Sequence, residues 1–105
     1  MIPTPTGRDV ADFLGSGDDA ALVTLAGQHV AIVTAMARSY TRGNGFIAGG
    51  VSEDLSAVII TAAARMVANP EQVNTQVGST AIYGGFKGWS LAELFVLNAW
   101  RGRAA

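Results

Sequence analysis

The chain has 105 residues, half of them hydrophobic and 14% of them charged, with a formal net charge of −1 and no cysteine. This length indicates a single domain over residues 1–105, and the absence of cysteine excludes disulfide bonds and thiolate metal sites. The near-neutral charge argues against a general basic surface for nucleic acid, and a charged fraction well below the ~25% of average soluble proteins suggests that other chains cover part of the surface.

The N-terminal residues predict an extended segment followed by a short helix. The proline-rich residues 1–5 favour extended backbone, and no basic region precedes an apolar run, so the segment lacks the pattern of a signal peptide. Thr6 and Asp9 have the spacing of a capping box, in which a hydroxyl caps a helix and an acid three residues later binds back. We expect the helix over residues 7–14, with Gly15 at its end.

The longest predicted helix covers residues 18–42. Asp18 and Asp19 are expected in its first turn, where the helix dipole favours negative charge, and Gly43 is expected to cap its end. Residues 20–37 carry no charge, but their polar side chains are untypical of a membrane span, so we expect none. Apolar side chains at helical spacing form two adjoining stripes. One stripe is Leu22, Leu25, His29, Ile32, Met36 and Tyr40, and the other is Val23, Ala26, Val30, Val33 and Ala37.

His29 is the only histidine of the chain. On an apolar stripe, we expect its imidazole to be packed and hydrogen-bonded rather than to bind a ligand. No cysteine, second histidine or carboxylate accompanies it at ligand spacing, so the sequence predicts no metal site.

Residues 43–52 contain four glycines and are not expected to form a helix. A short strand and a loop are both compatible with this composition. The segment lacks the lysine of a P-loop, and it follows a predicted helix rather than the strand that a dinucleotide-binding fingerprint needs. We therefore predict no nucleotide site here.

The next predicted helix covers residues 53–68. Ser52 is expected to cap it, with two acidic residues in its first turn. Asn69-Pro70 ends it, because the residue before a proline disfavours helical geometry. One face of this helix is apolar, and it consists of Leu55, Val58, Ile59, Ala62, Met66 and Val67.

A polar segment over residues 73–83 has the alternation and the β-branched residues of a strand. A turn at Gly78 would make it a small hairpin. Two strands alone are marginally stable in water, and an uncharged strand edge tends to aggregate unless something covers it. We therefore expect this segment to pack on the helices or to pair with a neighbouring subunit.

Ser90 and Glu93 form the clearest capping box of the chain and predict a last helix over residues 91–101. Its apolar side chains lie on all sides, which is typical of a buried helix. A terminal helix of so small a domain is hard to bury all round, so we expect one face to pack on the core and another to meet a partner. The fold class predicted by these elements is mainly α, a small bundle of about four helices with a short β hairpin or strand before the C-terminal helix.

Four features in the second half of the chain occur in a distinctive order. They are an Ala-rich helix with an arginine that ends in Asn-Pro (62–70), a polar β-like segment with glycine (76–86), Gly-x-Ser-Leu-x-Glu (88–93), and an aromatic residue followed by arginine at Trp100 and Arg101. In this order the chain resembles the head-to-tail connector (adaptor) proteins of long-tailed bacteriophages.

The resemblance implies a structural virion protein with no catalytic activity and no cofactor. It implies a ring of identical subunits, typically twelvefold, that is assembled in the host cytoplasm and lies in the neck between capsid and tail. The ring would bind the portal protein on one side and a tail-side stopper or tail protein on the other. Double-stranded DNA would pass through the lumen without sequence-specific binding, and no membrane would be involved.

The same resemblance implies three sets of contact residues. The portal-binding residues would be Leu97, Trp100, Arg101 and Arg103. The loop facing the channel or the tail side would present Gly43, Asn44, Phe46 and Ile47. Contacts between subunits would involve Val77, Ile82 and Tyr83 of the β-like segment.

Three other classes of protein remain open. Another neck or tail-completion protein, such as a stopper or tail terminator, would share ring assembly, although such proteins tend to be β-rich. A nucleic-acid-binding module would need a basic recognition helix, and no predicted helix has more than two arginines. A small enzyme would need a nucleophile with a base, or paired carboxylates. The candidates, Ser39 or Tyr40 with His29 and Asp18 with Asp19, lack the partners that catalysis needs.

Overall fold

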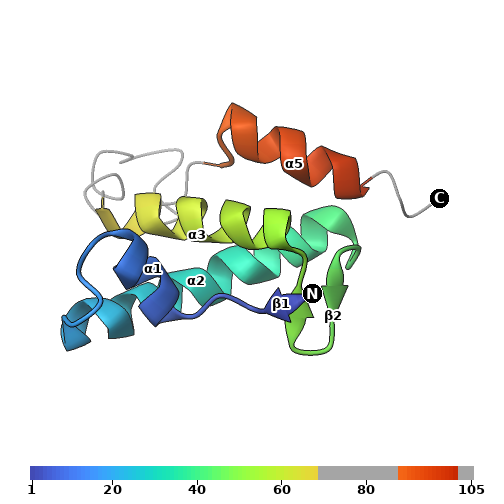
Figure 1. Ribbon diagram of the computed structural model, residues 1–105. Helices are drawn as coiled ribbons and strands as arrows, with labels where there is room; N and C mark the ends of the chain where they lie inside the picture. Colours follow the sequence, from blue (N-terminus) through green and yellow to red (C-terminus); the bar gives the residue numbers. More distant parts are fainter. Residues whose placement is uncertain (69–87, 102–105) are drawn as a thin grey trace.

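The computed structural model describes residues 1–68 and 88–101 of the chain (Figure 1). In chain order its elements are β1 (Ile2–Pro3), α1 (Gly7–Phe13), α2 (Ala20–Thr41), β2 (Phe46–Ile47), β3 (Gly50–Val51), α3 (Glu53–Ala68) and α5 (Leu91–Arg101). The predicted mainly α fold is confirmed, with four helices and a small antiparallel sheet in the described part of the chain. The predicted β-like segment with Val77, Ile82 and Tyr83 lies outside the described residues, and so does Arg103.

Helix α1 begins with the predicted capping box. The Asp9 N–H donates to the Thr6 hydroxyl at 3.2 Å, and the Thr6 N–H donates to the Asp9 carboxylate at 2.8 Å. The first residue of the helix, Gly7, lies directly against α2, since a Cβ there would come within 2.4 Å of the Val23 carbonyl oxygen. Any larger side chain at Gly7 would push α1 away from α2.

Helix α2 begins and ends within two residues of the prediction, but its caps differ from those expected. Asp19 is the N-cap itself, with extended backbone, and its carboxylate accepts from the Leu22 N–H at 3.1 Å. The expectation that Asp18 and Asp19 lie in the first turn was therefore wrong, because a side chain at the N-cap reaches the free N–H groups better than one inside the helix. At the other end Arg42, with φ 61°, is the C-cap, and Gly43 follows it.

The segment between α2 and α3 forms a hairpin, so the strand alternative for residues 43–52 is correct. Strand β3 lies between β1 and β2, and it is antiparallel to both. Val51 is paired with Ile2 on one side and with Phe46 on the other. The N-terminal residues thus close one edge of the sheet.

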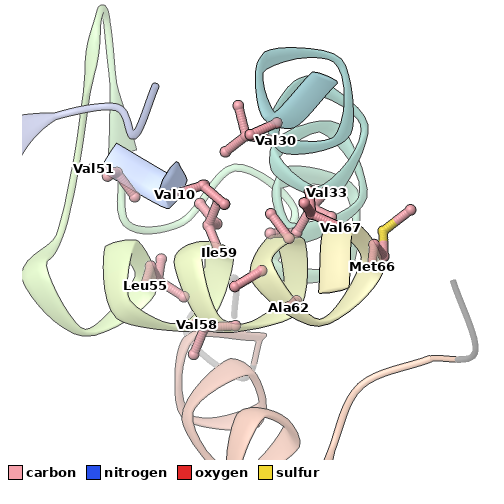
Figure 2. Packing of buried hydrophobic residues seen from close by; sticks show 14 of the residues in the cluster. Val10, Val30, Val33, Val51, Leu55, Val58, Ile59, Ala62, Met66 and Val67 are labelled. Carbon is pink, nitrogen blue, oxygen red and sulfur yellow. The ribbon is translucent and has the colours of Figure 1, made fainter. Parts of the chain in front are cut away.

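Helix α3 lies at the centre of the molecule, with α1 and α2 on one side and α5 on the other (Figure 1). In Figure 2, Val10 of α1 and Val30 of α2 lie on the side of α3 that carries Ile59, whereas Val58 points towards α5. Leu97 is the buried contribution of α5 to this core. Small side chains on α3 permit this close approach on both sides, namely Ala62, Ala63 and Ala64, all of which are buried.

The two apolar stripes of α2 have different surroundings. The stripe with Ala26, Val30, Val33 and Ala37 is buried in the core, whereas Leu25, Ile32 and Met36 of the other stripe remain exposed. His29 is half-buried between them, and its Nδ1 atom is buried without a hydrogen-bond partner among the described residues, so the expected hydrogen bond is absent at this nitrogen. By length and composition α2 could cross a membrane, a property that core helices of globular proteins share.

Candidate functional site

The start of α5 is fixed by the predicted capping box. The Ser90 N–H donates to Glu93 Oε1 at 2.8 Å, and the Glu93 N–H donates to the Ser90 hydroxyl at 3.2 Å. Gly88, just before the cap, has a φ of +101°, which a residue with a side chain rarely adopts. The chain therefore turns into α5 at a defined point.

Glu93 also anchors α5 to α3. Arg65 binds both of its carboxylate oxygens, with Nη1 3.0 Å from Oε2 and Nη2 2.9 Å from Oε1. The Thr61 hydroxyl donates to Oε2 at 2.7 Å, and Arg65 also donates to the Gly88 carbonyl at 3.3 Å. The Glu93 side chain is only 6% exposed, whereas the Arg65 side chain is 37% exposed. A bidentate arginine pair of this kind fixes orientation as well as distance.

The electrostatics of this pair keep both groups charged. Burial by itself raises the pKa of Glu93, but the hydrogen bonds from Arg65, Ser90 and Thr61 and the charge of Arg65 outweigh it, so the pKa lies below its usual value. The hydrogen bond to Glu93 raises the pKa of Arg65 in turn. The pair therefore stays ionised at neutral pH, and α5 stays attached.

The C-terminal half of α5 is held by a second group of polar contacts. The Tyr40 hydroxyl donates to Asn98 at 2.6 Å, and the Trp100 indole N–H donates to Asp54 at 3.0 Å. Asn44 donates to the Trp100 carbonyl at 3.1 Å. These contacts come from α2, from α3 and from the turn after α2, so α5 is fixed along its whole length.

Of the predicted portal-binding residues, Leu97 requires a correction. Its side chain is fully buried in the core, so it is not available to a partner while the domain is folded. Trp100 is half-buried and bonded to Asp54, so its first role is to hold α5. Arg101 is exposed, with its guanidinium 4.9 Å from the centroid of the Tyr40 ring.

The outward face of α5 contains two residues that the predicted set omitted. Leu91 is 86% exposed and Phe95 is 82% exposed, one helical turn apart. We call this pair the outward face. The buried residues of α5, Glu93 and Leu97, are also one turn apart and lie on the opposite side of the helix. Sequence reasoning could have found the outward face from the spacing alone, once one of these two positions was taken as buried.

The predicted channel or tail-side loop is divided between two environments. Gly43 and Asn44 lie at its base, where the Asn44 side chain donates to the Trp100 carbonyl at the end of α5. Phe46 is half-buried beneath Arg38, whose guanidinium is 5.0 Å from its ring centroid, and only Ile47 is well exposed. In Figure 1 the turn between β2 and β3 lies on the opposite side of α3 from α5. The loop therefore touches the predicted portal-binding helix at its base and points away from it at its tip.

At the base of this loop, Gly45 permits a close approach of the backbone to Leu55 and Trp100. Its φ is +85°, and a Cβ there would lie 2.4 Å from a Leu55 methyl group and 3.2 Å from the Trp100 ring. The glycine thus lets Trp100 reach its place against α3.

Among residues 1–68 and 88–101, no group of three or more His, Asp or Glu side chains is arranged to hold a metal ion. A shallow groove of about 230 Å³ lies between α3 and α5, and its lining is almost wholly apolar.

Comparison of the chain with protein-family models, curated protein sequences and solved structures finds no match.

Proposed function

We propose that this chain is a structural virion protein, the adaptor subunit of a head-to-tail connector ring that joins the portal at the capsid vertex to the tail and extends the DNA channel. The observation that carries the proposal is the outward face of α5, an exposed apolar pair on a helix that polar contacts join to α2 and α3. It adds to the order of sequence features between residues 59 and 101 that resembles the adaptor family.

The outward face suits docking on another protein. Burying a Leu or Phe side chain that is otherwise exposed is worth about 1.5–3 kcal/mol. Because α5 is already fixed by Glu93, Asn98 and Trp100, little order has to be gained on binding. We therefore place the portal contact on Leu91, Phe95 and the exposed Arg101, in place of the buried Leu97.

A subunit between a portal and a tail needs contacts on two sides. The exposed Ile47 near the hairpin tip offers a second contact, away from α5, for a tail-side protein. The near-neutral net charge is compatible with a DNA channel, because tight binding to phosphates would hinder passage. Subunits of the ring, typically twelvefold in the resembled family, would meet in heterologous contacts that close.

The test is co-sedimentation of the chain with the portal protein encoded by the same genome, followed by imaging of the pellet. We expect the wild-type chain to add a ring to the portal. A double variant, Leu91→Ser with Phe95→Ser, should lose this binding while its helical circular dichroism is unchanged. Phe13→Ser is the matched control, because Phe13 is also well exposed but lies on α1.

Equal binding by the double variant and the wild type would place the portal contact elsewhere. Binding to a tail-side protein with none to an intact portal would instead favour a stopper or tail terminator. Binding to neither would end the neck-protein proposal.

A further inference from the structure

The exposed stripe of α2 is a second apolar surface, separate from α5. Its large side chains are Leu25, Ile32 and Met36, which are 40%, 51% and 38% exposed. They lie on one side of a helix of 22 residues, beside the stripe that forms the core. The half-buried His29 lies among them, and burial lowers the pKa of its imidazole, so the ring is neutral at neutral pH.

The spacing between the residues of this stripe is the same whether it is followed from the N-terminal or from the C-terminal end of the helix. Leu25 is four residues before His29, and Met36 is four residues after Ile32. If two copies of α2 pack antiparallel with Leu25 of one level with Met36 of the other, His29 is level with Ile32 as well. Each large side chain of one copy then has a counterpart on the other, which is the requirement of a twofold, self-complementary contact.

The charges at the two ends of α2 favour the same arrangement. Asp18 and Asp19 lie exposed at the start of the helix, and Arg38 and Arg42 lie exposed at its end. Asp19 is six residues before Leu25, and Arg42 is six residues after Met36, so this register brings the acidic start of one helix level with the basic end of the other. The two side chains lie on different faces of the helix pair, so the attraction between the ends acts at long range and forms no ion pair. A parallel pair would put like charges together, and it would also align the two helix dipoles unfavourably.

We propose that a second copy of this chain covers the exposed stripe, with two α2 helices packed antiparallel across a twofold axis near residues 30 and 31. This dimer is a property of the free chain, so it does not depend on the adaptor function. A helix of 22 residues is about 33 Å long. With a helix diameter of about 10 Å, the contact face covers on the order of 330 Å². This is less than the ~800 Å² per partner of a standard interface, so we expect a weak, concentration-dependent dimer.

The first experiment is sedimentation velocity over a range of protein concentrations. We expect a reversible monomer–dimer equilibrium in the micromolar range. Ile32→Asp should abolish the dimer without unfolding the domain, because Ile32 is half exposed in the single chain. Ile47→Asp is the matched control, because it introduces the same charge at a well-exposed isoleucine of the hairpin and should leave the dimer unchanged.

A cross-linking experiment tests the direction of packing. The chain has no cysteine, so the variants Leu25→Cys and Met36→Cys each carry a single thiol. A disulfide requires Cα atoms within about 7 Å. In the antiparallel register, residue 25 of one copy and residue 25 of the other lie about 16 Å apart along the axis, and the same holds for residue 36. Residue 25 of one copy and residue 36 of the other lie level. With oxidised glutathione, an equimolar mixture should therefore form mixed dimers at least about tenfold faster than either variant forms its own.

The outcomes separate this proposal from its alternatives. A chain that stays monomeric at all concentrations overturns it, and so does a dimer that survives Ile32→Asp or cross-links fastest between like variants. Flotation of the chain with phosphatidylglycerol vesicles where no dimer forms would show that lipid covers the stripe instead. Because the portal test uses α5 variants, either proposal can fail while the other holds.

Discussion

Nine of the sixteen residues of α3 are buried, whereas Glu93 and Leu97 alone are buried among the eleven residues of α5. Both helices are apolar, yet α3 is enclosed on two sides and α5 is attached on one side. The difference lies in the contacts. Helix α3 is held by apolar packing on two sides, whereas α5 combines one buried core residue, Leu97, with hydrogen bonds through Glu93, Asn98 and Trp100. An apolar composition therefore does not by itself tell whether a helix is covered by its own chain.

The largest effect should come from truncating the centre of α3. Ile59→Ala removes a fully buried side chain and leaves a cavity between helices that are packed on both sides. We expect the free energy of unfolding to fall by about 3–5 kcal/mol, measured by urea denaturation. The same substitution at the well-exposed Ile47 should cost much less, and similar losses at both positions would contradict the central position of α3.

Truncation of the single buried apolar residue of α5 should cost less. Leu97→Ala removes a fully buried side chain, but the loss affects one helix on one side of the core. We expect a loss of about 2–3 kcal/mol. Hydrogen exchange should become faster in α5 before it becomes faster in α3. Equal acceleration in both helices would show that α5 unfolds only with the whole domain.

The polar anchor of α5 should contribute next. Glu93→Gln keeps an acceptor for the cap but removes the charge that Arg65 binds, and we expect a loss of about 1–3 kcal/mol, kept modest because Arg65 is partly exposed. Because the folded-state pKa of Glu93 is lowered, its contribution is complete above the usual carboxyl pKa of about 4.3 and is lost as the pH falls through the lower folded value.

Urea denaturation of the wild type and of Glu93→Gln at several pH values tests this sign. The difference between them should shrink in acid. Glu53→Gln is the control, since Glu53 is exposed at the start of α3. A difference that grows in acid would contradict an ionised, bonded Glu93.

The smallest effect on stability should come from the outward face. Phe95→Ala removes the largest exposed side chain of α5, and we expect unfolding to change by no more than about 0.5 kcal/mol. The same variant should lose portal binding. A loss of stability comparable to that of Leu97→Ala would mean that Phe95 belongs to the core.

The buried face could be predicted from the sequence for α3 but not for α5. Every residue of the apolar face predicted for α3 is buried. The prediction held because the apolar side chains of this helix form one continuous face at helical spacing, and that face packs against the rest of the core. For α2 the spacing predicted two adjoining apolar stripes, and for α5 it predicted apolar side chains on all sides, so the pattern did not show which side would be buried. Leu97 was therefore assigned to a partner although it lies in the core, and Phe95 was omitted although it is exposed.

The sequence by itself determined where most helices begin and end and that the fold is mainly α. The bonds of the two capping boxes join residues three apart, Thr6 with Asp9 and Ser90 with Glu93, so no distant part of the chain is needed to form them. Only the tertiary structure decided which stripe of α2 is buried and that Arg65 binds Glu93 across 28 positions. Burial and long-range ion pairs depend on which elements meet, and the spacing within a single helix does not contain that information.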